Sequence, residues 1–336
     1  MPEARRVKIA VTYNNHDISG WVSGVTYSDN SDKTDDISIR LSDRAERWYN
    51  EWFPETGDQV AASIDVINWR WPNDNRSMSF GSFEVDNTEM SDTVTVNGVA
   101  VPITSSIRSE TKTKRWKKIR LRGIAKKIAA NASLELVYET DVDPYYDRSE
   151  QNNKSDLAFL EELCKSDGLC VKVTDGQLVI FEESKYDQME AVGTIEKGVS
   201  LYKGKPKFAR NAKNIYSACE IAFTDSRTDK TYKGRFEALN VGNVGHVLKV
   251  NEKFNSKTDD IQYNRKAKAR LREQNKNEWT ARLTMCDGLF YYAGTNLNIK
   301  GWYKFDGKYH VKSATYDIGG SGFTVDLELR RCLEGY

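Results

Sequence analysis

The stretch "SDLAFLEELCKSDGLCVKVTDGQLVIFEE", residues 155–183, begins with a helical pattern and ends with the pattern of a β-hairpin. Ser155 predicts an N-cap, and the leucines after it recur at helical spacing. Gly168 stands where the end of a helix favours a left-handed residue. Asp175 and Gly176 then predict a two-residue turn between alternating strands. The stretch therefore predicts a helix packed on a hairpin.

Two cysteines in this stretch raise the question of a metal or redox site. Cys164 falls on the apolar stripe of the expected helix, and Cys170 alternates against Leu169 and Val171 in the following strand. No second Cys/His pair completes a zinc set. Five cysteines in 336 residues do not make a disulfide framework. We therefore expect two structural, reduced thiols, with no metal and no cofactor.

The chain before this stretch divides into two regions. Residues 1–105 alternate with period two in "VKIAVTY" and "DISIRLSD", between turns rich in Asp, Asn and Gly, which predicts an antiparallel β domain, either a barrel or a sandwich. Residues 106–185 predict a small α/β domain. Within it, apolar residues at helical spacing begin at Leu121, and a polar loop is expected over residues 141–153.

The chain after this stretch returns to β structure. Residues 186–206 are expected to form a linker. Residues 207–336 predict a second, mainly β domain that contains one polar helix over 259–278 and ends in a long hairpin. The fold class is therefore expected to be mainly β with an α/β insert, in which two β domains flank the small α/β domain.

Composition narrows the possible functions. No run of 18 apolar residues exists, which argues against a membrane partner, and the first residues lack an apolar signal core. The net charge of +1 disfavours a protein that binds nucleic acid over its whole surface. With only His16, His246 and His310 available, triads and metal sites based on histidine are poorly supported. Carboxylates are abundant, but no local pattern singles out a catalytic acid.

One segment concentrates positive charge. Residues 111–127, "TKTKRWKKIRLRGIAKK", contain nine Lys or Arg and no acid. One interpretation is a phosphate-binding stripe with Trp116 as an aromatic platform. The interpretation that we prefer is a solvated or subunit-facing surface at the start of a helix. The candidate basic surface or interface consists of Lys114, Arg115, Lys117, Lys118, Arg120 and Arg122.

The order of the motifs resembles a known family, the baseplate hub proteins of contractile phage tails, also called late-control gene-D-type tail proteins. The family is related to the hub part of type VI secretion spike proteins. The likeness lies in three passages: residues 122–139, residues 151–183 and residues 267–332. The positions that match the family's motifs are Ser155, Asp156, Phe159, Leu160, Gly168, Asp175, Gly176, Ala293, Gly294, Gly301, Gly307, Tyr309, Val311, Gly322 and Leu329.

This resemblance implies a structural role without catalysis. Members look like homotrimers whose subunits each supply two similar β-barrel domains. The resemblance therefore implies a first tube-type β-barrel over residues 1–105 and a second over residues 207–336, which flank the small α/β domain. Three subunits would form a pseudo-sixfold ring that joins a six-fold tail tube to a trimeric central spike. It implies a location in a virion or tail-like particle, such as a bacteriocin, assembled in the host cytoplasm. Tape-measure and baseplate wedge proteins are further expected partners, with DNA only as cargo passing through the lumen.

Two other hypotheses stay open at this point. The first is a tail-associated enzyme that degrades peptidoglycan, for which one of the many carboxylates would have to act as the acid. The second is a nucleic-acid-binding module that uses residues 111–127.

Overall fold

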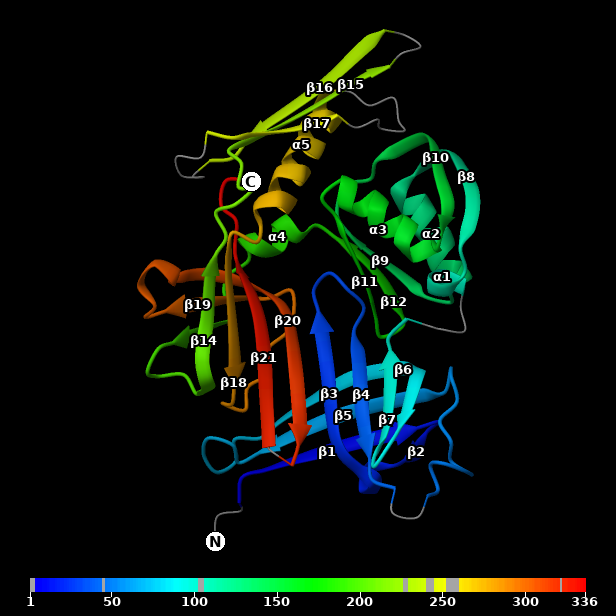
Figure 1. Cartoon of the computed structure of the whole chain (residues 1–336), viewed down its shortest axis with the longest axis vertical. Helices are drawn as coiled ribbons and strands as arrows, with labels where there is room; N and C mark the ends of the chain where they lie inside the picture. Colours follow the sequence, from blue (N-terminus) through cyan, green and yellow to red (C-terminus); the bar gives the residue numbers. More distant parts are fainter. Residues whose placement is uncertain are drawn as a thin grey trace.

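The computed structural model describes residues 4–43, 46–101, 106–225, 229–239, 245–251, 260–320 and 322–336. Figure 1 shows a large β body, an α/β module beside its upper part, and a small sheet with a helix at one end. The fold class expected from the sequence, mainly β with an α/β insert, is confirmed. The domain boundary expected after residue 105 adjoins residues 102–105, outside the described part.

The α/β module confirms the opening stretch in detail. The side chain of Ser155 accepts a hydrogen bond from the Ala158 N–H, and Asp175 and Gly176 both have the positive φ of a tight hairpin turn. The apolar faces of α2 and α3 pack together with the three-stranded sheet β11-β12-β9. The elements of the module are α1 (Ser106–Ser109), β8 (Lys112–Arg120), α2 (Leu121–Asn131), β9 (Glu135–Glu139), β10 (Tyr145–Lys154), α3 (Asp156–Ser166), β11 (Cys170–Thr174), β12 (Gln177–Phe181) and α4 (Glu183–Gln188).

The prediction of a polar loop over residues 141–153 is wrong, because most of this segment forms β10, which pairs with β8. The basic segment therefore enters the fold mainly as a strand, and α2 begins only at Leu121. The inward positions of β10 include Ser149 and Gln151, which are buried. The Gln151 amide donates to Asp156 at 2.9 Å. Because inward positions of β10 carry buried polar side chains, its sequence lacks the apolar alternation that predicts a strand.

One sheet of thirteen strands forms the β body. Pairing of β20 with β3 joins its two halves, and Tyr316 stacks on Tyr27 across that junction with ring centroids 5.7 Å apart. The strands are β1 (Arg6–Tyr13), β2 (His16–Asp17), β3 (Val22–Asn30), β4 (Asp36–Leu41), β5 (Gln59–Ile67), β6 (Arg76–Met90), β7 (Val94–Val99), β13 (Gly193–Glu196), β14 (Tyr202–Arg210), β18 (Trp279–Met285), β19 (Asn296–Lys300), β20 (Gly307–Gly319) and β21 (Gly322–Arg331). Short 3-10 turns, η1 (Ser19–Trp21) and η2 (Tyr303–Phe305), connect some of them.

The two halves of this sheet repeat one topology. We call β3 to β7 the N-terminal unit, and β14 with β18 to β21 the C-terminal unit. Counted along the chain within each unit, both pair in the order first, second, fifth, fourth, third. All these pairs are antiparallel. The chain therefore contains the same five-stranded arrangement twice.

A backbone clamp in the N-terminal unit fixes the middle of β6. The Val85 N–H donates to the Asp58 carbonyl at 2.8 Å, and the Val85 carbonyl accepts from the Gly57 N–H at 2.9 Å. Gly57 has a φ of 93°, which glycine adopts at little cost. The β6–β7 ladder is irregular immediately after Val85, at Asp86.

The C-terminal unit contains the same clamp. The Val311 N–H donates to the Thr295 carbonyl at 2.8 Å, and the Val311 carbonyl accepts from the Gly294 N–H at 2.9 Å. Gly294 has a φ of 85°, and the β20–β21 ladder is irregular immediately after Val311, at Lys312. The two units can therefore be matched residue by residue, with Val85 equivalent to Val311.

A separate layer is inserted between the first and second strands of the C-terminal unit. It consists of β15 (Ala218–Asp225), β16 (Lys230–Glu237), β17 (Val247–Asn251) and α5 (Asp260–Asn275). The polar helix expected here is present, with Ala267 and Leu271 buried. A Cβ on Gly234 would clash with the backbone of Tyr263, so this glycine allows α5 to lie close to β16.

The segment expected to be a linker contributes residues to two strands of the sheet, β13 and β14. Of residues 186–206, those in β13 pair with β19 and those at the start of β14 pair with β18. Among the described helices, none is long and apolar enough to cross a membrane.

Candidate functional site

Three buried charge clusters hold the α/β module against the rest of the chain. The first lies at the end of α3. Asp167, which is buried, accepts from Arg265 at 2.6 Å and from Lys266 at 3.0 Å, and both of these bases lie on α5. Burial alone would raise the pKa of Asp167, but the two cations outweigh it and lower the pKa. Gly168 also lies close to α5, at Ala269.

The second cluster ties the module to both halves of the sheet. Lys172 on β11 lies 2.7 Å from Asp29 and 3.1 Å from Asp35, at the end of the β3–β4 hairpin. Asp29 also accepts from the backbone N–H of Ala293 at 2.8 Å, in the loop that follows β18. One carboxylate thus contacts the module, the N-terminal unit and the C-terminal unit.

The third cluster surrounds Arg330 on β21. Its guanidinium lies 2.8 Å from Asp187 and 2.9 Å from Glu183, and both of these acids belong to α4. Burial opposes ionisation of Glu183, but Arg330, then Lys276 and Arg272, hold its pKa at about 2. The cluster therefore stays ionised at neutral pH and fixes α4 to the sheet.

His310 lies buried beside this cluster. Its Nδ1 is 3.2 Å from the Asn296 side-chain oxygen and 3.7 Å from Asp187. Burial, followed by the positive charge of Arg330, lowers the pKa of His310 to about 4. The ring is therefore neutral at pH 7. The other two histidines are both exposed: His16 in β2 and His246 immediately before β17.

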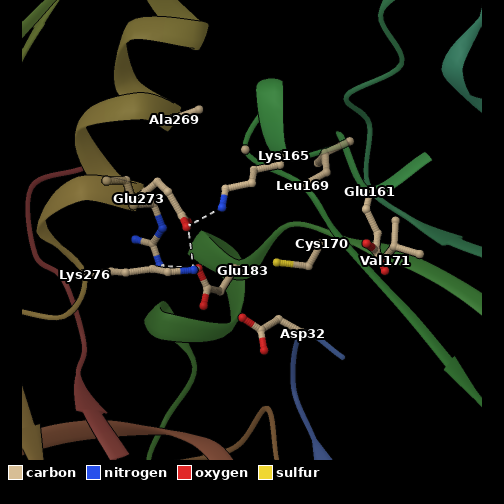
Figure 2. A pocket seen from close by; sticks show the side chains of 12 residues that line it. Asp32, Glu161, Lys165, Leu169, Cys170, Val171, Glu183, Ala269, Glu273 and Lys276 are labelled. Carbon is tan, nitrogen blue, oxygen red and sulfur yellow. Dashed lines mark ion pairs between the residues drawn. The ribbon is translucent and has the colours of Figure 1, made fainter. Parts of the chain in front are cut away.

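A cavity of about 200 Å³ lies between the module, at α3, β11 and α4, and the rest of the chain, at α5 and the β3–β4 loop (Figure 2). Glu273 reaches Lys165 at 3.0 Å and Lys276 at 2.8 Å, so the carboxylate is neutralised on both sides. Cys170 points into the cavity. Burial raises the pKa of this thiol well above its usual range, which makes it a poor nucleophile and ligand at neutral pH.

The predicted structural role of the two cysteines fits these surroundings. Cys164 is fully buried in the core of the module, and burial also raises the pKa of its thiol. Within the described part of the chain, no three His, Cys, Asp or Glu side chains gather in a way that could hold a metal ion.

The candidate basic surface lies on β8 and the start of α2, and intramolecular partners occupy part of it. Arg115 pairs with Glu150 at 3.2 Å. Arg120 donates to the Asp143 carbonyl at 2.8 Å. Arg122 lies over the Tyr138 ring, 4.5 Å from its centroid. Lys114, Lys117 and Lys118 remain exposed on the same ribbon.

The interpretation of Trp116 as an aromatic platform on this surface is wrong, because Trp116 is buried. Its ring stacks 6.3 Å from the ring of Phe159, inside the module. Lys114 lies over it, 3.9 Å from the ring centroid. The indole is therefore part of the core and is not available for stacking with a base.

The two units leave strand edges free on opposite sides of the β body (Figure 1). Within the described residues, β14 pairs with β18 alone, and its exposed side chains include Lys203, Lys205 and Lys207. On the other side, residues 87–90 of β6 pair with β7 and with no other described strand. This second edge carries the exposed acid Glu89.

Exposed apolar side chains lie beside both free edges. Met189, Val192, Val199 and Leu201 are exposed just before β14. Tyr49 and Phe53 are exposed in the loop next to β6, where the Tyr49 hydroxyl donates to the Ser91 carbonyl. Exposed apolar groups next to an unpaired strand edge are typical of a protein interface.

Comparison with solved structures identifies the fold. The 43 kDa tail protein of prophage MuSo2 from Shewanella oneidensis superposes with a TM-score of 0.69 and 13% identity, over 98% of this chain and 100% of that chain. A tail protein from Neisseria meningitidis MC58 superposes with a TM-score of 0.71 and 13% identity, over 97% and 96% of the two chains. This chain has the fold of those tail proteins.

A third solved structure extends the comparison to secretion. The E. coli c3393 protein is described as a component of the type VI secretion system with structural similarity to the T4 bacteriophage tail proteins gp27 and gp5. It has a TM-score of 0.57 and 10% identity, over 98% of this chain and 78% of that chain. No protein-family model matches the sequence, and no curated protein does either.

Sequence reasoning missed the charge clusters and the free edges. Asp167 pairs with Arg265, 98 residues away in the chain, and Asp187 pairs with Arg330, 143 residues away, so no local pattern marks them. The one usable signal was "YKGKPKFAR", where lysines alternate along a strand. That pattern is typical of an edge strand.

Proposed function

We propose that the chain is the structural hub subunit of a contractile phage tail or tail-like particle, and that three copies form a ring. The observation that carries the proposal is the internal duplication of the five-stranded unit. Three copies of a chain with two equivalent units supply six equivalent units. Such a ring matches a six-fold tube on one face while it keeps the threefold symmetry that a trimeric spike requires.

The proposed partners are the tail tube protein on one side and the central spike protein on the other, with tape-measure and baseplate wedge proteins nearby. Support comes from the tail-protein fold, shared over nearly the whole chain, and from the likeness to a type VI secretion component. The proposed location is the baseplate of the particle, which is assembled in the host cytoplasm, and DNA would only pass through the lumen.

We propose no catalytic step for this subunit. In the cavity of Figure 2, Glu183 and Glu273 are neutralised by cations and the thiol of Cys170 is protonated. These two carboxylates are thus held in ion pairs, Glu183 with Lys276 and Glu273 with Lys165 and Lys276. Their arrangement suits rigid docking of the module onto the body.

The experiment that tests the ring is negative-stain imaging of the purified chain at high concentration, with class averaging. We expect rings with a central hole and threefold or apparent sixfold symmetry. Compact particles without a hole at the highest concentration, together with a monomer mass in sedimentation, would contradict a chain that forms the ring by itself.

A further inference from the structure

The duplication defines how one copy can contact the next, an inference that rests on the proposed ring. Within one chain, the fourth strand of the C-terminal unit, β20, pairs with the first strand of the N-terminal unit, β3. If the two units exchange roles, the equivalent pair is the fourth strand of the N-terminal unit, β6, with the first strand of the C-terminal unit, β14. Those two strands carry the free edges and lie on opposite sides of the molecule (Figure 1).

The matched clamps give the register of β6 against β20. Because Val85 is equivalent to Val311 and an irregular position follows each, Asn87 corresponds to Ser313 and Met90 to Tyr316. In β20, Ser313 is the first residue that pairs with β3. The first residue of β6 free to pair with another copy is therefore Asn87.

The ladders give the register of β14 against β3 in the same way. Across the neighbouring strands, Tyr27 pairs with Ile37, Ile37 pairs with Gly98, and Gly98 pairs with Val85. Phe208 pairs with Ala281, which leads through Leu329 to Val311. Phe208 is thus equivalent to Tyr27.

We propose that residues 208–211 of one copy pair antiparallel with residues 87–90 of the next. The partner is a second copy of this chain. Since Tyr316 pairs with Tyr27 inside the chain, Met90 lies opposite Phe208 between copies. Glu89 lies opposite Ala209.

Side-chain chemistry on the two edges agrees with this register. Met90 and Phe208 are both half-buried against the sheet core, so their contact continues the core across the junction, as the stacked Tyr27 and Tyr316 do within the chain. Glu89 lies diagonal to Lys207 on the same face, which pairs opposite charges. The exposed apolar groups beside β6 and β14 would then be covered.

A cysteine cross-link tests the register directly. Glu89 and Ala209 are both exposed, and directly opposite residues in an antiparallel pair have Cβ atoms close enough for a disulfide. In the full chain carrying Glu89→Cys with Ala209→Cys, a mild oxidant should produce covalent dimers and closed trimers on a non-reducing gel. The matched control is Glu89→Cys with Arg210→Cys, because Arg210 faces the other side of the sheet. It should stay monomeric on the gel.

The outcomes separate this inference from the proposed ring. Cross-linked trimers in the first variant alone support the junction. Rings on the grid without cross-linking would place the contact elsewhere and overturn the junction while the ring stands. Equal cross-linking of both variants would indicate random collision and also overturn the junction. The absence of both rings and cross-links would contradict the ring and the junction together.

Discussion

At the scale of the residue, His310 is a neutral base buried beside charge. Arg330, Asp187, Glu183 and Arg272 surround it, and its pKa is about 4 in the folded chain against about 6.5 in an unfolded one. Below pH 6.5 the unfolded chain binds a proton on this histidine that the folded chain does not. The free energy of unfolding therefore decreases as the pH is lowered from about 6.5 to about 4. The histidine therefore makes the fold sensitive to mild acid.

The prediction concerns His310→Gln between pH 7 and pH 5. The native chain should lose about 2 kcal/mol more stability over this range than the variant. Glu183 contributes little there, because its lowered pKa weakens the fold only below about pH 4.5. Denaturant unfolding at both pH values measures the difference. Parallel pH dependence in the two proteins would contradict a neutral buried ring.

Local residue chemistry was predictable from the sequence, whereas the partners of buried charges were not. Ser155, Gly168 and the Asp175-Gly176 turn follow from backbone rules that act over a few residues. The environment of His310 depends on β21 and α4, which reach it only through the tertiary fold.

At the scale of the element, the prediction failed where buried positions are polar. In β10 the buried residue Gln151 is polar, so apolar and polar residues do not alternate along the strand. β8 has charged residues at most positions. The apolar strands β4 and β21 were predictable because one face is uniformly buried. The free edges were not, because pairing between strands far apart in sequence leaves no local pattern.

The contact between α3 and α5 gives a prediction at this scale. Asp167→Asn removes the negative charge that faces Arg265 and Lys266. Because a buried ion pair then loses one partner, the free energy of unfolding should fall by about 3 kcal/mol. Denaturant unfolding measures the loss, and amide exchange should rise in both helices. Glu162→Gln is the matched control, because its pair with Lys154 is exposed and should contribute under about 0.5 kcal/mol. Equal effects would show that Asp167 does not dock the module.

At the scale of the whole molecule, the duplication explains why one sheet serves both halves of the chain. The β20–β3 pair closes the junction inside each copy, and its counterpart remains open at β6 and β14. An open edge of this kind invites uncontrolled pairing. Opposite charges on the two edges, with Glu89 on one and Lys207 on the other, restrict pairing to the correct partner edge.

The last prediction tests that charge pair by exchange. Glu89→Lys or Lys207→Glu alone places like charges on one face of each junction, at a cost of roughly 0.5 kcal/mol per junction. Three junctions make about 1.5 kcal/mol, or about tenfold weaker trimer formation. The double variant restores opposite charges and should return to the native concentration dependence in sedimentation. If the two effects simply add, Glu89 and Lys207 do not meet, and residues 208–211 contact something other than β6.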